Sequence, residues 1–207
     1  MQPVLIGIAG PSGAGKSELA NALRRRLPEP VVVVSLDSYY RSLTHMCFEE
    51  RAQYNFDHPD ALEWSLVVED VRRIARGEAI EEPVYQFERH DRAAQTRRVE
   101  PAPYVILEGL FALYHEQVRE HLAARIFVEA PDDVCLDRRI ARDTVERGRT
   151  REGVIQQYQR TVRPMARQYL LPTRQFADLV VSGESPIEHS VEAVCQLLAP
   201  QRCACAG

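Results

Sequence analysis

Five short apolar runs recur along the chain, each followed by a more polar stretch. They occupy residues 4–10, 31–37, 104–109, 124–130 and 177–183. The runs are nearly continuous in apolar residues and do not alternate with polar ones, which is typical of parallel strands buried on both faces of a sheet. We therefore expect these segments to form a parallel β-sheet.

Between the runs, apolar residues recur at helical spacing. Residues 16–27 carry one apolar stripe, formed by Leu19, Ala20, Leu23 and Leu27. Residues 186–198 carry another, formed by Ile187, Val191, Val194, Cys195 and Leu198. The alternation of strand and helix predicts a doubly wound α/β fold, with helices flanking a parallel sheet.

The alternation is interrupted between about residues 40 and 101, a stretch rich in aromatic residues, His, Asp and Arg. We interpret this stretch as an inserted lobe that binds the substrate. A chain of 207 residues fits one domain with such an insert. We expect a single domain over residues 1–200, and a flexible tail with Cys203 and Cys205 over residues 201–207.

The net charge of the chain argues against nucleic acid as a binding partner. The net charge is −4 and the sequence pI is about 5.9, whereas a nucleic-acid-binding protein is usually basic. The first apolar run is too short to span a membrane and lacks the pattern of a signal peptide. Five scattered cysteines, an odd number, indicate reduced thiols. We expect a cytoplasmic protein that binds neither nucleic acid nor membrane, but that could hold a small anion in a local basic pocket.

Residues 10–17 match the phosphate-binding pattern G-x-x-x-x-G-K-[ST], placed between an expected strand and an expected helix. Lys16 is the only lysine among 26 basic residues, and its compact charge suits the β- and γ-phosphates of a nucleotide better than the planar fork of arginine. The glycines let backbone N–H groups point at phosphate oxygens. A Gly-rich turn with a chance lysine is the alternative. The predicted phosphate-binding residues are Gly10, Ser12, Gly13, Ala14, Gly15, Lys16 and Ser17.

Two acidic residues lie at the ends of expected strands, where ligands bind in open parallel sheets. Glu108, together with the hydroxyl of Ser17, is predicted to hold Mg²⁺; otherwise it is a glutamate that merely meets solvent. Asp37 could orient an acceptor hydroxyl and take its proton, and the alternative is an aspartate that caps a turn.

Further segments, in order along the chain, carry a family resemblance. They are LDSYY (36–40), YNFDHPDAL (54–62), PVYQFERHDR (83–92), ILEGLFAL (106–113), RRIARDTVERGR (138–149) and QYQRTVRPM (157–165). With the phosphate-binding loop, they resemble the uridine/cytidine kinases of the P-loop kinase superfamily. The resemblance implies an enzyme of pyrimidine salvage that transfers the γ-phosphate of ATP or GTP, with Mg²⁺, to the 5′-hydroxyl of uridine or cytidine. It also implies a homo-oligomer.

The same resemblance implies roles for single residues. It makes Asp37 the catalytic base, and it places Arg142 and Arg147 beside Lys16 at the donor phosphates. The two arginines belong to an arginine-rich lid over about residues 138–152. The nucleoside site would comprise Tyr40, Phe56, Asp57, Tyr85, Phe87, His90, Arg139, Arg149 and Gln157.

The chemistry of these side chains agrees with the implied roles. An ionised Asp57 accepts hydrogen bonds only, so it suits the two hydroxyls of a ribose diol. Tyr85 and Phe87 offer aromatic faces to a pyrimidine, although ordinary core packing would also explain them. A neutral His90 carries one donor and one acceptor, and its two tautomers suit uracil and cytosine in turn. The alternative is a polar surface histidine.

Acidic residues are interleaved with the arginines of 138–149, and Asp143 with Arg147 is an i,i+4 pair. A solvated, salt-bridged helix is therefore the alternative to a lid. Gly148 lies where a lid would bend, and phosphoryl transfer needs positive charge around the γ-phosphate. We expect Arg139, Arg142, Arg147 and Arg149 to be functional, and Arg138 and Arg151 to lie at the surface.

Other functions fit the sequence less well. A related small-molecule kinase resembling phosphoribulokinase is the first alternative, although a sugar phosphate needs no aromatic pocket. A Ras-like GTPase is excluded, because its [NT]-K-x-D guanine motif needs a second lysine. A non-catalytic nucleotide-binding regulator is the remaining alternative, but none of the proposed catalytic residues is missing.

Overall fold

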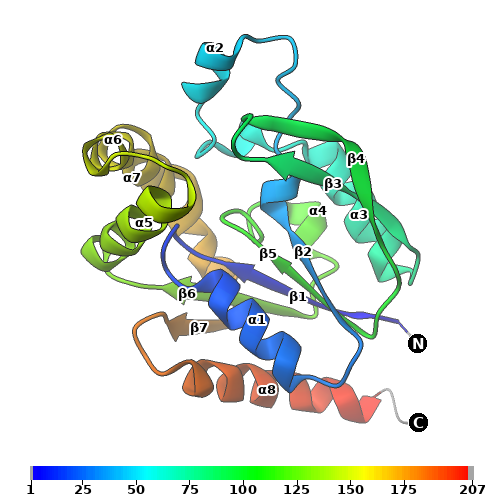
Figure 1. Cartoon of the computed structure of the whole chain (residues 1–207). Coiled ribbons are helices and arrows are strands. Elements are labelled where there is room, and N and C mark those ends of the chain that lie inside the picture. Colours follow the sequence, from blue (N-terminus) through cyan, green and yellow to red (C-terminus); the bar gives the residue numbers. More distant parts are fainter. Residues whose placement is uncertain (1, 205–207) are drawn as a thin grey trace.

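Five parallel strands form the central sheet of the molecule (Figure 1). The computed structural model describes the backbone of residues 2–204 and the side chains of residues 2–199. In spatial order the strands are β2 (Val31–Ser35), β5 (Tyr104–Glu108), β1 (Val4–Ala9), β6 (Ala124–Glu129) and β7 (Leu179–Ser182). Each expected apolar run contains one of these strands, so the predicted parallel α/β sheet is confirmed.

Helices and short helical turns connect the strands. In chain order they are α1 (Lys16–Arg26), the 3-10 turn η1 (Leu36–Tyr39), α2 (Phe48–Ala52), the 3-10 turn η2 (Pro59–Ala61), α3 (Trp64–Ala75), α4 (Glu116–Arg119), α5 (Asp132–Glu146), α6 (Arg151–Gln157), the π-helical turn η3 (Tyr158–Val162), α7 (Arg163–Met165), the π-helical turn η4 (Ala166–Leu170), the 3-10 turn η5 (Leu171–Phe176) and α8 (Ile187–Ala204). Because α8 continues to residue 204, the first four residues of the expected tail are helical. The side chain of Cys203 and all of Cys205 lie outside the described residues.

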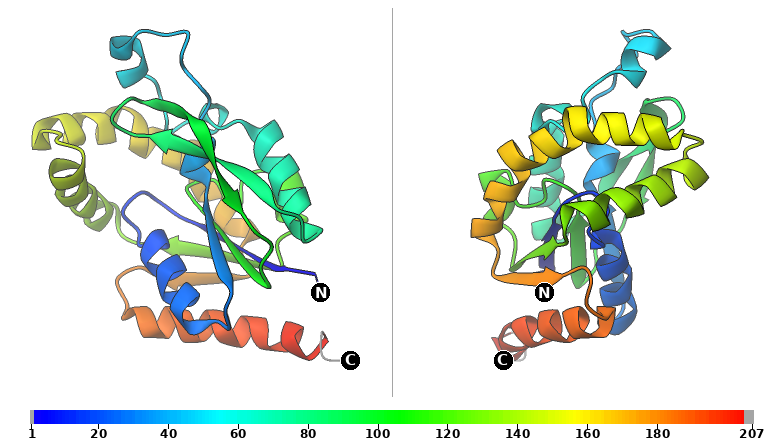
Figure 2. Two further views of the ribbon diagram at one scale, coloured as in Figure 1. Left: turned by 45° about the vertical axis from the view of Figure 1, so that its right-hand side comes forward. Right: turned by 90° about the vertical axis from the view of Figure 1, so that its left-hand side faces the viewer.

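Helices cover both faces of the sheet, because successive strand residues point to opposite faces. Ile6 and Ile8 of β1 face the layer formed by α1 and α8, which lie together on one side in Figures 1 and 2. Leu5 and Ala9 face the second core, to which α3 contributes its apolar stripe. The two cores fix the sheet between rigid layers.

The segment 40–101, expected as an inserted lobe, is built from two different parts. Its helix α3 packs into the main core of the domain. Its second part is an antiparallel hairpin, β3 (Ile80–Gln86) with β4 (Asp91–Val99), which forms a sheet of its own. The register of this hairpin shifts between Pro83 and Tyr85, and such irregularities re-aim side chains.

The carboxyl ends of three adjacent strands meet at one edge of the sheet. Ser35 of β2 and Ile8 of β1 both pair with Glu108 of β5. The phosphate-binding loop leaves β1 at this edge, and η1 leaves β2 there. Helices α5 and α6 lie side by side over the same region (Figure 2).

None of the helices in residues 2–204 has the length and apolar content needed to cross a membrane.

Candidate active site

A cavity of about 730 Å³ lies at the carboxyl edge of the sheet. Its wall is formed by the phosphate-binding loop, η1, the β3–β4 hairpin, the end of β5 and the α5–α6 region. Every predicted site residue except Gly10 and Ala14 lines it. The residues concerned are Ser12, Gly13, Gly15, Lys16, Ser17, Asp37, Tyr40, Phe56, Asp57, Tyr85, Phe87, His90, Glu108, Arg139, Arg142, Arg147, Arg149 and Gln157.

The phosphate-binding loop passes too close to its neighbours to carry larger side chains. A Cβ atom at Gly10 would lie 2.2 Å from the carbonyl oxygen of Val128, and one at Gly13 would lie 2.4 Å from that of Cys135. Gly13 also has a φ of 87°, a conformation that favours glycine. Gly10 and the buried Ala14 therefore shape the loop from beneath and do not face the cavity.

Lys16 begins helix α1 and is held against the loop itself. Its Nζ donates a hydrogen bond to the carbonyl oxygen of Pro11 at 2.9 Å, and only 9% of the residue is exposed. Burial lowers the pKa of Lys16, while the carboxylates of Glu108 and Asp37 oppose that shift. An ammonium group has three N–H donors, so two remain to serve phosphate oxygens beside the N–H groups of the first helical turn.

Oxygen ligands suited to a magnesium ion converge on Glu108. The Ser17 hydroxyl donates to one carboxylate oxygen of Glu108 at 3.2 Å, and the Ser35 hydroxyl donates to the other at 2.9 Å. Burial raises the pKa of Glu108, and the positive charge of Lys16 opposes the shift. Within the described residues, no group of three or more His, Cys, Asp and Glu side chains could hold a metal. A hydroxyl and one carboxylate nevertheless fit Mg²⁺, which takes its remaining ligands from phosphates and water.

Asp37 lies two residues beyond the end of β2, in the first turn of η1, and not in the strand itself. Ser35, and not Asp37, caps this turn, since its hydroxyl accepts the backbone N–H of Asp37 at 3.4 Å. Among the side chains of residues 2–199, the carboxylate of Asp37 has no hydrogen bond and no ion pair within 4.0 Å. A turn-capping role does not explain this side chain, which lines the cavity and interacts electrostatically with Lys16 and Arg147.

Asp57 is buried between the cavity and the helix after α6. One of its carboxylate oxygens accepts the hydroxyl of Thr161 at 2.9 Å, and the other lies 4.0 Å from the guanidinium of Arg139. Burial raises the pKa of Asp57, whereas Arg139 and Thr161 hold it down. The carboxylate keeps lone pairs available for further donors, as a sugar diol would supply.

An aromatic cluster forms the cavity wall around Tyr85. The ring centroid of Tyr40 lies 5.2 Å from those of Phe56 and Tyr85, and Phe87 lies 5.2 Å from Tyr85. The Tyr85 hydroxyl is buried without a hydrogen-bond partner in the described structure, and 38% of Phe87 is exposed. These rings are therefore not plain core residues, because both line the cavity and Phe87 keeps an exposed face.

His90 faces the same cluster from the tip of the hairpin. Its backbone has a φ of 51°, which is uncommon for a non-glycine residue, and its ring stacks on Phe56 at 5.9 Å. Burial lowers the pKa of His90, and the neighbouring cations Arg149 and Arg147 lower it further. The imidazole is therefore neutral at neutral pH, and it offers one donor and one acceptor.

The predicted lid arginines occupy the opposite wall. Arg139 donates to the Ser12 hydroxyl of the phosphate-binding loop at 3.0 Å and to the side-chain oxygen of Gln157 at 3.0 Å. Arg149 donates to the same Gln157 oxygen at 2.6 Å. The guanidinium of Arg147 stacks over Phe87, 4.5 Å from the ring centre. The lid segment thus contacts both the loop and the hairpin.

The two arginines expected at the surface are both exposed, but one has a further contact. Arg138 donates to the carbonyl oxygens of Gly13 at 3.3 Å and of Gly183 at 3.0 Å, and it lines the cavity. It ties the phosphate-binding loop to the loop after β7. Arg151 has no hydrogen bond or ion pair to the side chains of residues 2–199 and does not line the cavity.

Three side chains that support the site were not among the predicted residues. Ser35 orients Glu108, Thr161 contacts Asp57, and Asp143 is a buried carboxylate among the lid arginines. The solvated helix considered for the arginine run is wrong at Asp143, which has no exposed surface. A serine two residues before Asp37 is a recognisable turn signal, whereas a contact between residues 57 and 161 leaves no local pattern.

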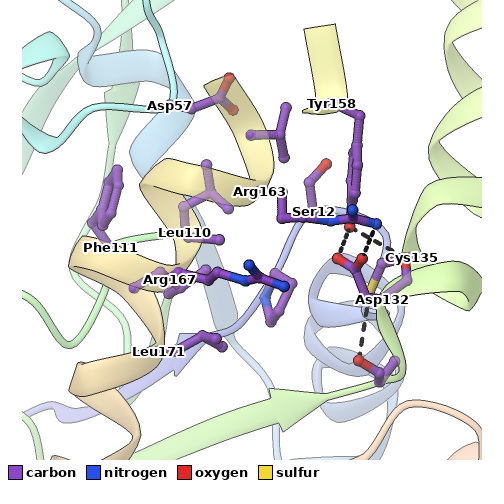
Figure 3. A pocket seen from close by; sticks show the side chains of 15 residues that line it. Ser12, Asp57, Leu110, Phe111, Asp132, Cys135, Tyr158, Arg163, Arg167 and Leu171 are labelled. Atoms are coloured by element: carbon purple, nitrogen blue, oxygen red, sulfur yellow. Dashed lines mark hydrogen bonds and ion pairs between the residues drawn. The ribbon is translucent and has the colours of Figure 1, made fainter. Parts of the chain in front are cut away.

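A second, smaller cavity of about 220 Å³ lies beside the first (Figure 3). Leu110, Phe111 and Leu171 give it an apolar wall, and Ser12 and Asp57 belong to both cavities. In Figure 3, Asp132 accepts hydrogen bonds from Tyr158 and forms an ion pair with Arg163.

Comparison with known proteins places the chain in a family. The model of the phosphoribulokinase/uridine kinase family matches residues 5–186. The uridine kinase of Salmonella typhimurium is 46% identical over 185 residues, which cover 87% of each chain. Among solved structures, the phosphoribulokinase from Rhodobacter spheroides has a TM-score of 0.65 at 16% identity, with 90% of this chain and 74% of that chain covered. The D-glycerate 3-kinase from Cryptococcus neoformans has a TM-score of 0.59 at 15% identity, with 81% and 79% covered. These two structures share the fold. The family model and the 46% identical relative show that the chain belongs to the phosphoribulokinase/uridine kinase family.

Proposed function

We propose that the protein is a nucleoside kinase that transfers the γ-phosphate of ATP or GTP to the 5′-hydroxyl of uridine or cytidine. One observation carries the proposal. A single cavity is lined by the phosphate-binding loop, by an aromatic cluster and by the buried residue Asp57. The relationship to uridine kinases at 46% identity supports it. A sugar phosphate would gain nothing from the aromatic cluster, which disfavours a phosphoribulokinase-like substrate.

The donor would bind at the loop. The backbone N–H groups of residues 13–17 and the ammonium of Lys16 would hold the β- and γ-phosphates. Ser17 and Glu108 would hold Mg²⁺, which supplies charge neutralisation at the phosphates when it is bound. Arg142 and Arg147 would stabilise the charge that spreads over the transferring phosphoryl group.

The acceptor would bind between the hairpin and the helix after α6. Asp57 would accept the 2′- and 3′-hydroxyls, while Arg139, Arg149 and Gln157 would hold the sugar side of the nucleoside. Phe56, Tyr40, Tyr85 and Phe87 would enclose the pyrimidine. The neutral imidazole of His90 would meet its polar edge, since it can donate or accept as the base requires.

The unpaired carboxylate of Asp37 would orient the 5′-hydroxyl and take its proton during transfer. A group in this role typically contributes ~10²–10⁴-fold to the rate. Its carboxylate oxygens accept no hydrogen bond from the described residues, so both are available to the acceptor hydroxyl, which supports the assignment.

The direct test is a product assay. The purified protein is incubated with ATP or GTP, Mg²⁺ and one nucleoside at a time, and the 5′-monophosphate is measured by chromatography. We expect product with uridine and cytidine, and far less with ribulose 5-phosphate. Nucleotide binding without any transfer would instead support a regulator. Homo-oligomerisation and a cytoplasmic location, expected from the sequence, remain predictions.

A further inference from the structure

The carboxylate of Asp143 lies at the centre of the arginine cluster, which we define as Arg139, Arg142, Arg147 and Arg149. Its first oxygen is 2.8 Å from a guanidinium nitrogen of Arg142 and 3.7 Å from one of Arg147. Its second oxygen is 3.4 Å from Arg149 and 3.6 Å from Arg139. Asp143 is fully buried, and all four arginines line the active-site cavity. One buried carboxylate therefore contacts all four arginines of the arginine cluster.

The backbone of Asp143 fixes the same region. Its carbonyl oxygen accepts the N–H groups of Arg147 at 3.3 Å and of Arg149 at 3.1 Å. Gly148, between these two residues, has a φ of 61°, which permits the tight turn. Both the path of the chain after α5 and the directions of the guanidinium groups thus depend on Asp143.

The charge around Asp143 is not balanced. Four guanidinium groups are permanent cations, and among the described residues only two carboxylates, those of Asp143 and Asp57, lie within 4.0 Å of them. Burial by itself raises the pKa of Asp143, but Arg142, Arg139 and Arg147 together lower it below the ordinary range, so the group is ionised at neutral pH. Burial and the neighbouring positive charge of Arg142 lower the pKa of Arg147, because both disfavour its charged form. The surplus positive charge faces the cavity.

We propose that Asp143 is a positioning residue for phosphoryl transfer: it assembles the arginine cluster before substrate binds and competes with the phosphates for its guanidinium groups. The inference rests on the kinase function proposed above. A phosphate that enters the cavity replaces part of the interaction with Asp143, while the remaining contacts keep the guanidinium groups aligned. Asp143 itself touches neither substrate.

Two consequences distinguish this role from simple stabilisation of the fold. Without the negative charge, anions should bind the arginine cluster more tightly, because a competitor has been removed. Turnover should nevertheless fall, because the guanidinium groups are no longer held in one arrangement. A structural carboxylate would affect the melting temperature and the yield of folded protein, but neither of these properties.

The test compares Asp143→Asn with Asp137→Asn, which removes the same charge from an exposed position of the same helix. For Asp143→Asn we expect kcat to fall at least about tenfold and the KM for ATP to fall roughly threefold. Inorganic tripolyphosphate should raise the melting temperature of Asp143→Asn more than that of the wild type. Asp137→Asn should match the wild type in every measurement.

Unchanged kcat and KM in folded Asp143→Asn, with a wild-type response to tripolyphosphate, would overturn the proposal. If Asp143→Asn does not fold, Asp143→Glu is used to test the positioning role. This variant keeps the negative charge but displaces it by one methylene group. We then expect reduced kcat with a normal tripolyphosphate response, and wild-type kcat would contradict a positioning role. The tripolyphosphate measurement needs no nucleoside, so it separates failure of this inference from failure of the proposed function.

Discussion

The two ends of the cavity are built in different ways. The phosphate-binding part of the donor end is one continuous loop, residues 10–17, fixed by β1 on one side and by α1 on the other. The acceptor end collects side chains from distant segments, as in the contact of Asp57 with Thr161, 104 positions further along the chain. The first end presents mainly backbone groups and one lysine, whereas the second presents side chains held by other side chains.

Because of this difference, substitutions at the two ends should reduce activity in two distinguishable ways. A change at the donor end removes an interaction that every acceptor needs, so all acceptors should suffer alike. A change at the acceptor end removes an interaction with one part of one molecule, so the loss should depend on which acceptor is offered. Each variant below is therefore measured with more than one nucleoside.

The largest effect is expected at Lys16. Lys16→Met should lower kcat/KM by about a thousandfold, equally for uridine and cytidine, because a buried charge at the transferring phosphates is lost. Lys16→Arg should remain strongly impaired, since a planar guanidinium does not fit the place of the ammonium against Pro11. Steady-state kinetics on variants with wild-type melting temperatures provide the measurement. Near-normal activity of Lys16→Arg would contradict the geometric part of this explanation.

Asp37 should have the next largest effect. Asp37→Asn should lower kcat at least about a hundredfold while it leaves the affinity for ATP unchanged, because only proton removal from the acceptor is affected. Turnover with both nucleosides and binding of a fluorescent ATP analogue are compared in the same preparation. If turnover stays close to normal, Asp37 is not the base.

Asp57 and Thr161 should discriminate between acceptors. Asp57→Ala should cost uridine ~10–100-fold more in kcat/KM than 2′-deoxyuridine, because hydrogen bonds from the diol to a charged group are lost. Thr161→Val should shift the same ratio in the same direction by less, since it removes the hydrogen bond that orients the Asp57 carboxylate and favours its ionised form. Equal losses for the two nucleosides would refute the diol assignment.

The smallest effect concerns pH. Burial raises the pKa values of Glu108 and Asp57, and both must be ionised to act, so kcat/KM should fall with decreasing pH at values above the ordinary carboxyl range. A metal ligand also binds the proton in competition with the metal. Raising the Mg²⁺ concentration should therefore move this acidic limb to lower pH if Glu108 causes it. A limb that does not move with Mg²⁺ would instead point to Asp57.

The donor end and the sheet were predictable from sequence because each depends on local pattern. Continuous apolar runs located the five strands, and the glycine spacing located the loop. The acceptor residues came from the family resemblance, since nothing local distinguishes Tyr85 from a core residue. Thr161 and Asp143 were missed for the same reason. At Asp143 the i,i+4 pair suggested a surface helix, and only the fold shows four arginines closing over it.

Because Ser35 and Ile8 pair with Glu108, the register of the sheet determines how far apart the catalytic groups lie. The separation between the metal ligand, the base and the phosphate loop is set by hydrogen bonds between neighbouring strands, and not by flexible side chains. A slip of β5 by a single residue would bring Leu107 to this edge and turn the carboxylate to the opposite face. Such a protein would lose the carboxylate beside Ser17 even if its phosphate-binding loop kept its conformation.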